Sequence, residues 1–264
     1  MIVFGAIAPH GDPVFADGSL TGEALQELGR RLEHARPDVI VVATPHNVHV
    51  EGAFATVVAA NLGGSLEEQG FAATGVSLTS SVDRELAAAL LGSLRAAGLP
   101  AVGMSFGSND PELAEMPMDW GTLIPLWFLG GRGEEALPVV VVSPCRERSL
   151  EDHVVAGRAI AAATDGRRVA FVASADHGHA HDPDGPFGFD PASAQYDAQV
   201  VGLVAGDRLG EVLALESIVQ AASADSLWQM AMLHGALGDA FRPELLSYER
   251  PTYFGMLVAS YEPV

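Results

Sequence analysis

The chain has 264 residues, 48% of them hydrophobic, and its 34 acidic and 14 basic residues give a formal net charge of -20. This apolar content excludes an intrinsically disordered protein, and the negative charge excludes proteins that bind nucleic acids or anionic membranes through clustered cations. No apolar run reaches the ~20 residues that a transmembrane helix needs.

The N-terminal segment is predicted to be the first strand of the fold. Residues 2–8 are apolar, but the basic residues and the small-residue cleavage site of a secretory signal peptide do not accompany them. Cys145 is the one cysteine of the sequence, so the chain forms no internal disulfide. Both observations predict a cytoplasmic protein.

Short apolar, β-branched runs recur along the chain without alternating with polar residues. Such runs favour strands that are covered on both faces of a parallel or mixed sheet. The predicted strands are residues 2–8, 39–44, 139–143, 169–174 and, near the end of the chain, 252–260.

Patterns of helical period lie between these runs. The predicted helices are residues 20–36, 80–97, 150–163, 191–206, 208–222 and 225–237. In the second of them, Ser80 and Asp83 have the spacing of a helix start, and Gly98 and Pro100 are stop signals. Strands that alternate with helices predict an α/β fold: a single-domain sandwich over residues 1–264, with a central mixed, largely parallel sheet flanked by helices.

Six of the nine histidines directly follow predicted strands. Ligands of open α/β sheets bind beyond the carboxyl ends of the strands, so side chains after neighbouring parallel strands meet at one patch. A single histidine is most often an ordinary core or surface residue, but six at strand ends indicate a shared metal or catalytic site. The residues concerned, with the aspartate beside them, are His10, His46, His49, Asp176, His177, His179 and His181.

Five segments occur in the order found in a known family. They are APHGDP around His10, VVATPH ending at His46, MDWGTLIPL over residues 118–126, SADHGH ending at His179, and DSLWQMAMLHGAL starting at Asp225. Together they resemble the class III extradiol ring-cleavage dioxygenases of the LigB type, whose fold also includes the MEMO-like proteins. The resemblance covers nearly the whole chain and implies one LigB-like domain over residues 1–264.

The resemblance implies a metal site. His10 and His46 correspond to the histidine ligands of Fe(II), and a carboxylate supplies the third ligand, leaving open positions for a catechol-type or aminophenol-type substrate and O2. The family commonly has Glu as this carboxylate, and Asp225 lies at the corresponding place in this sequence. Asp225 is also suited to cap the following helix, and Glu216 or a water molecule is the alternative third ligand.

The resemblance also implies catalytic residues. His179 corresponds to the acid–base histidine, and Asp176 is expected to orient it or a neighbouring group. His177 is expected in a catalytic role and His181 in substrate binding, or both line the mouth of the loop.

One aromatic residue departs from the family's pattern. Trp120 stands where many members have a histidine, and it either shapes an aromatic-binding pocket or packs in the core. His49, on the loop of His46, is a candidate to replace the missing histidine and bind substrate.

These observations lead to three functional hypotheses. The first is an Fe(II)-dependent extradiol dioxygenase that acts on a small aromatic diol with O2. The second is a Zn(II)-dependent hydrolase, and the third is a non-catalytic metal-binding or scaffold protein of the MEMO kind. We expect a homo-oligomer, although some relatives work with a small partner subunit.

Overall fold

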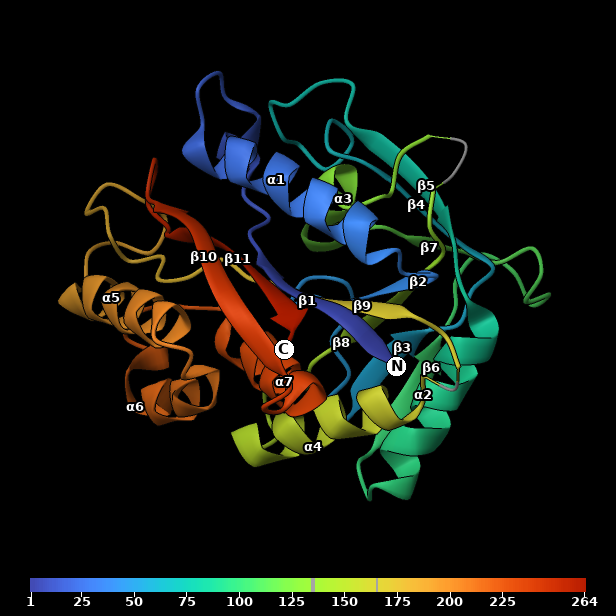
Figure 1. The fold of residues 1–264 in the computed structure, drawn as a ribbon. Coiled ribbons are helices and arrows are strands. Elements are labelled where there is room, and N and C mark those ends of the chain that lie inside the picture. The colour runs from blue at the N-terminus through green and yellow to red at the C-terminus, as the bar shows by residue number, and fades with distance from the viewer. Residues whose placement is uncertain (134–135, 165) are drawn as a thin grey trace.

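The structure is a computed structural model that describes residues 1–133, 136–164 and 166–264, and eight strands within these ranges form a mixed sheet at its centre (Figure 1). In chain order the strands are β1 (Ile2–Ala8), β2 (Val39–Ala43), β3 (Phe54–Val57), β6 (Ala101–Met104), β8 (Val139–Ser143), β9 (Val169–Ser174), β10 (Phe241–Glu249) and β11 (Met256–Pro263). Their order across the sheet is β10-β11-β1-β9-β2-β8-β3-β6.

The four central strands, β1, β9, β2 and β8, run parallel to one another. Every residue of β2, β8 and β9 is buried, which explains why their sequences are continuously apolar. Because the strands are parallel, the residues that follow β1, β2 and β9 emerge at the same edge of the sheet. This edge carries the histidine-rich segments.

Helices cover both faces of the sheet (Figure 1). On one face lie α1 (Leu20–Ala35) and α3 (Trp120–Phe128), together with a small three-stranded sheet of β4 (Asn61–Ser65), β5 (Ser77–Ser81) and β7 (Glu115–Pro117). The other face carries α2 (Arg84–Ala96), α4 (Leu150–Ala162) and α7 (Leu227–Leu237), while α5 (Pro191–Ala205) lies beside β10 and the short α6 (Glu216–Val219) contacts α5. The predicted fold class is therefore confirmed.

A close contact between α4 and α7 fixes the position of the C-terminal helix. A Cβ atom added to Gly157 of α4 would overlap the carbonyl oxygen of Met232, and one added to Gly235 of α7 would overlap that of Val154. Both positions therefore need glycine for the backbones to come this close. The contact holds α7 against the sheet, so that its first turn reaches the edge with the histidines.

The predicted helix over residues 80–97 is wrong at its start. Ser80 belongs to β5, where it pairs with Leu62, and α2 begins at Arg84. Asp83 is the true N-cap, since its carboxylate accepts a hydrogen bond from the Leu86 amide. The Ser-x-x-Asp spacing therefore spans two elements, because Ser80 belongs to a strand and Asp83 caps the helix that follows.

Two C-terminal predictions also shift. The region 208–222 forms a 3-10 helix over Leu209–Leu215 followed by α6, rather than one continuous helix. The last strand begins at Met256, because residues 252–255 form a bend that lines a cavity. None of the helices in the described ranges combines the length and apolar character needed to cross a membrane.

Candidate active site and metal centre

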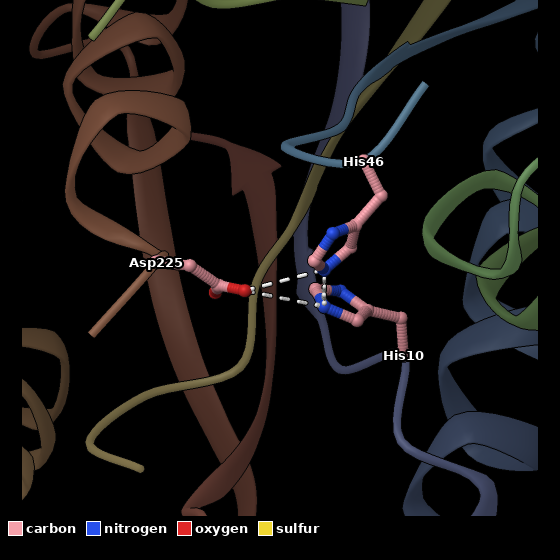
Figure 2. A group of neighbouring side chains, drawn as sticks. All are labelled: His10, His46 and Asp225. Atoms are coloured by element: carbon pink, nitrogen blue, oxygen red, sulfur yellow. Dashed lines mark hydrogen bonds and ion pairs between the residues drawn. The ribbon is translucent and has the colours of Figure 1, made fainter. Parts of the chain in front are cut away.

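His10, His46 and Asp225 meet at the carboxyl-terminal edge of the sheet (Figure 2). His10 follows β1, His46 follows β2, and Asp225 immediately precedes α7. The two Nε2 atoms are 2.9 Å apart, and Oδ2 of Asp225 lies 3.3 Å from Nε2 of His46 and 3.6 Å from Nε2 of His10. Within the part of the chain that the structure describes, this is the one group of three or more such side chains with metal-binding proximity.

The neighbours of His10 fix which of its nitrogens is free to bind a metal. The Ser174 hydroxyl donates its proton to the carbonyl of Gly121, so its oxygen accepts a hydrogen bond from Nδ1 of His10 at 2.9 Å. Nδ1 therefore carries a proton, and Nε2 is the nitrogen that faces the cluster. This arrangement is typical of metal-binding histidines, whose outer nitrogen is held by a neighbouring acceptor.

Asp225 is buried, with 7% of its surface exposed, and its Oδ1 has no hydrogen-bond partner among the described residues. It does not cap α7, because that helix has Ser226 as its N-cap residue and no side-chain capping bond. Burial raises the pKa of Asp225, but His10 and His46 outweigh this effect and hold the pKa well below its usual range. Glu216, the alternative ligand, is exposed at the start of α6 and lies outside the cluster.

These three side chains fit a metal ion. Two nitrogen lone pairs and a carboxylate oxygen this close together repel one another unless a cation or a proton lies between them. The unpaired Oδ1 of Asp225 adds a buried acceptor without a donor, which costs free energy in an apolar surrounding. A divalent ion would satisfy both conditions.

Asp176 supports the cluster from the loop after β9. Its Oδ1 accepts a hydrogen bond from the backbone amide of His10 at 3.0 Å, and its Oδ2 lies 3.6 Å from Nε2 of His10. Burial lowers the pKa of His10, but the carboxylates of Asp176 and Asp225 outweigh this and raise the pKa to about 9. Burial raises the pKa of Asp176 itself.

The His46 side of the cluster is held by the start of α3. Asp119 caps this helix and also accepts hydrogen bonds from the side chains of Thr44 and Asn47, which flank His46. A Cβ atom on Gly121 would overlap Thr44, so this close approach needs glycine. Trp120 packs on the His46 ring with a centroid distance of 4.3 Å and an angle of 30° between the planes.

A cavity of about 410 Å³ opens over His10, His46 and Asp225. Its aromatic lining consists of two groups of rings in mutual contact, Trp120 with Phe71 and Tyr253 with Phe254 and Phe187. His179 also lines it, stacked on Phe254 with ring centroids 5.4 Å apart, and its buried Nδ1 has no hydrogen-bond partner in the described structure. The volume and the five aromatic side chains of the lining suit a small ring-shaped ligand.

The other predicted site residues point elsewhere. His177 is fully buried and does not line the cavity; its Nδ1 lies 3.0 Å from Oγ of Ser226, which in turn contacts the Tyr196 hydroxyl at 2.9 Å. Burial lowers the pKa of His177, which keeps the ring neutral. The side chain of His49 is 63% exposed and pairs with Glu147 at 2.6 Å.

His181 also lies away from the cluster, against a buried aspartate that the sequence analysis did not identify. Asp197, on α5, accepts hydrogen bonds from Nε2 of His181 at 2.8 Å, from the Gly178 amide at 2.7 Å and from the Tyr248 hydroxyl at 2.7 Å. Gly178 and His181 flank His179 in the sequence. Asp197 therefore holds the loop that carries His179.

Asp119, Ser174 and Asp197 are supporting residues that the sequence analysis did not identify. Ser174 stood in the quoted segment SADHGH, where its place as the last residue of a strand was the available signal. Asp197 gave no signal, because an aspartate within a helix is usually a solvated surface residue.

Comparisons with known proteins identify a matching family, a relative in sequence and a similar structure. A family profile described as "Catalytic LigB subunit of aromatic ring-opening dioxygenase" matches residues 10–259. A curated relative, Protein CA_C1420 of Clostridium acetobutylicum, is 22% identical over 87% of this chain, which spans only 49% of that protein's length. A solved structure of the uncharacterized protein JW3007 from Escherichia coli K12 has a TM-score of 0.65 at 16% identity and covers 98% of this chain and 99% of that chain, a likeness of fold.

Proposed function

Because the chain belongs to the LigB family of catalytic subunits of aromatic ring-opening dioxygenases, we propose that it is an Fe(II)-dependent extradiol dioxygenase. Its substrate would be a catechol-type or aminophenol-type ring, opened with O2 beside the two neighbouring heteroatoms. The observation that carries the proposal is the His10–His46–Asp225 cluster at the floor of an aromatic-walled cavity.

The three ligands match the chemistry that the reaction needs. Two neutral imidazoles and one carboxylate on one side of an Fe(II) ion are the ligand set of many oxygenases, and they leave positions open towards the cavity. When bound there, Fe(II) would supply a meeting point for the two substrate oxygens and O2 and a route for electron density between them. Ser174 would keep Nε2 of His10 available for this role.

His179 is the proposed acid–base residue. It lines the same cavity as the three ligands, and its Nδ1 has no competing partner in the described structure. A neutral imidazole at this place would accept a proton from a substrate hydroxyl as the substrate binds, and would return it when the ring opens. Asp197 would hold the His179 loop at the required distance by its bonds to Gly178 and His181.

The aromatic walls would orient the substrate. Trp120 packs on His46 at one side of the cavity, and Phe254 packs on His179 at the other. A planar ring between them would gain apolar contacts while its oxygens point to the floor. His49, His177 and His181 do not line the cavity, so the proposal gives them no contact with substrate.

Oxygen uptake tests the proposal directly. Protein purified without oxygen and loaded with Fe(II) should consume O2 in the presence of at least one member of a catechol and aminophenol panel, with a coloured ring-opened product. The matched control is His34→Ala, which removes an exposed histidine of α1 and should leave uptake unchanged. If iron-loaded protein consumes no O2 with any member of the panel, the proposal is wrong; zinc-dependent hydrolysis would then favour the hydrolase.

A further inference from the structure

A second cavity lies at the amino-terminal edge of the parallel strands, opposite the edge that carries the histidines (Figure 1, near the N label). Its volume is about 480 Å³, which is within the range of small-molecule sites. The lining residues come from the starts of β1 and β10, from the residue before β9, and from the ends of α1 and β11. The seven residues of β1 run from this cavity towards His10, so about 20 Å of strand separates it from the metal cluster.

Part of the lining is apolar. Val3 and Phe241 are buried in the hydrophobic core, and Ile2 and Ala35 are half-buried and pack against it. Such walls favour a ligand whose hydrocarbon part covers them, because this removes apolar surface from water. Phe241 is the one phenylalanine, tyrosine or tryptophan among the described lining residues, whereas the cavity over the metal cluster has five. The walls therefore suit an aliphatic body better than an aromatic ring.

Arginines predominate among the charged side chains of the lining. Arg31, Arg36 and Arg168 line the cavity, and Glu262 is the one acidic residue among the lining residues that the structure describes. Arg31 is neutralised, because its guanidinium contacts the carboxylate of Glu244 at 2.6 Å. The guanidinium groups of Arg36 and Arg168 have no carboxylate partner in the described residues, although the chain carries 34 acidic residues. The cavity is therefore locally positive on a protein whose net charge is -20.

The two arginines without a carboxylate differ in the donors that they have left. The guanidinium of Arg168 donates to the backbone carbonyls of Ala35 and Arg36, at 2.6 and 2.8 Å, and so satisfies the C-terminal end of α1. The guanidinium of Arg36 makes no hydrogen bond, ion pair or ring contact with any residue that the structure describes. Its planar fork of N–H donors is therefore available to the two oxygens of a carboxylate.

The backbone at Arg36 allows this side chain to be removed cleanly. Arg36 is the C-cap residue of α1 and has the left-handed conformation, with φ 47° and ψ 61°. Glycine is the usual residue at such a position, because a side chain makes this conformation less favourable. The Arg36 amide donates to the carbonyls of Leu32 and Glu33, and glycine would keep both bonds. Arg36→Gly should therefore remove the guanidinium without weakening the fold.

We propose that this cavity is a second ligand site, which binds a small aliphatic carboxylate of medium chain length. Arg36 binds the carboxylate group, the positive charge of Arg168 adds to the attraction, and the apolar walls cover the chain. The site is separate from the metal cluster, and the proposal does not depend on the dioxygenase assignment.

Titration calorimetry on the full chain tests the site with three probes. Octanoate has both the charge and the chain, octanamide keeps the chain without the charge, and acetate keeps the charge without the chain. Octanoate should bind at least about tenfold more tightly than either of the others. A charge-assisted hydrogen bond contributes about this factor, and so does the burial of several methylene groups.

Substitutions on α1 assign the binding to this cavity. Arg36→Gly should weaken octanoate binding about tenfold, to the level of octanamide, with a thermal midpoint equal to that of wild type or higher. Arg36→Lys should retain part of the affinity, because lysine keeps the charge without the planar fork. Arg30→Gln is the matched control: Arg30 is an exposed arginine of the same helix that pairs with Glu27 and does not line the cavity, so octanoate binding should be unchanged.

Three outcomes overturn the proposal. Octanoate binds no more tightly than octanamide, or Arg36→Gly binds octanoate as tightly as wild type does, or Arg30→Gln weakens binding as much as Arg36→Gly does. The last result would mean that the anion responds to the overall charge of α1 rather than to this cavity. Because binding is measured without turnover, the result stands whether or not the protein consumes O2 with a diol.

Discussion

Among the buried aspartates that contact histidines at the carboxyl-terminal edge of the sheet, Asp197 and Asp225 have different surroundings. Asp197 accepts hydrogen bonds on both oxygens, from the amide of Gly178, the imidazole of His181 and the hydroxyl of Tyr248. Asp225 has one oxygen facing two imidazole nitrogens and a second oxygen with no partner in the described structure. A carboxylate with hydrogen bonds on both oxygens holds a loop in place, whereas one with an unpartnered oxygen is prepared for a ligand.

The largest predicted effect is on metal binding by the unsatisfied cluster. His10→Ala, His46→Ala and Asp225→Ala should each lower metal affinity by more than about 100-fold and abolish turnover, because each removes one of three donor atoms. Metal content after dialysis against a competing chelator measures this, with His34→Ala as the unaffected control. If the Asp225→Ala protein retains iron as well as the wild type does, Asp225 is not a metal ligand and the contrast drawn with Asp197 is wrong.

His179→Ala should separate proton handling from metal binding. We expect normal metal content and a loss of turnover of about 10²–10⁴-fold, the usual contribution of a general acid–base residue. The measurement is kcat for oxygen uptake on the iron-loaded variant. Loss of iron in this variant would mean that His179 belongs to the metal cluster rather than to the cavity wall.

Ser174→Ala tests the support of His10. Without the hydroxyl, nothing holds the proton on Nδ1 of His10, and the ring can shift to the tautomer that is protonated on Nε2. Metal affinity should then fall about 10- to 100-fold, as it does when partners of metal-binding histidines are removed. Competition with a coloured chelator gives the affinity. The contradicting result is a variant that binds metal as wild type does.

Asp197→Ala should have the smallest effect on the metal and a clear effect on stability. It leaves the Gly178 amide and the Tyr248 hydroxyl without their acceptor, which should lower the free energy of unfolding by about 2–3 kcal/mol. Asp197→Asn keeps part of the acceptor capacity and should cost less. Chemical unfolding gives the stability, and metal content should remain near wild type; a loss of metal as severe as in Asp225→Ala would show that the two carboxylates are not distinct in role.

Much of the central architecture was predictable because it depends on local sequence. The apolar runs of β1, β2, β8 and β9 mark strands that are buried on both faces, and the strand ends place His10 and His46 at one edge. The short strands β3 to β7 and the edge strand β10 were not predicted. Segments such as NLGGS in β4 and SLTSS in β5 have little apolar character, and their pairing with distant strands determines their conformation.

The three members of the candidate metal cluster were predictable, but among their supporting residues only Asp176 was expected. A histidine after a strand or an acid before a helix is visible in one segment, whereas the bonds of Asp197 depend on how α5 packs against a loop and against β10. The same reason explains why the sequence analysis placed His49 and His181 in the site although neither lines the cavity. Both stand in histidine-rich segments, yet each side chain turns to an acid, Glu147 or Asp197, whose position only the folded chain determines.

The three members of the candidate metal cluster come from distant parts of the sequence, His10 and His46 from its first fifth and Asp225 from its last. A nascent chain therefore cannot assemble the cluster until residue 225 has been synthesised and α7 has packed on α4. Metal uptake would then follow completion of the fold, and a bound ion would connect the first and last parts of the sheet. Because the ion would bind the folded chain far better than the unfolded one, the thermal midpoint should rise with metal concentration, and the size of that rise at a given concentration reports the affinity of the folded chain for the ion.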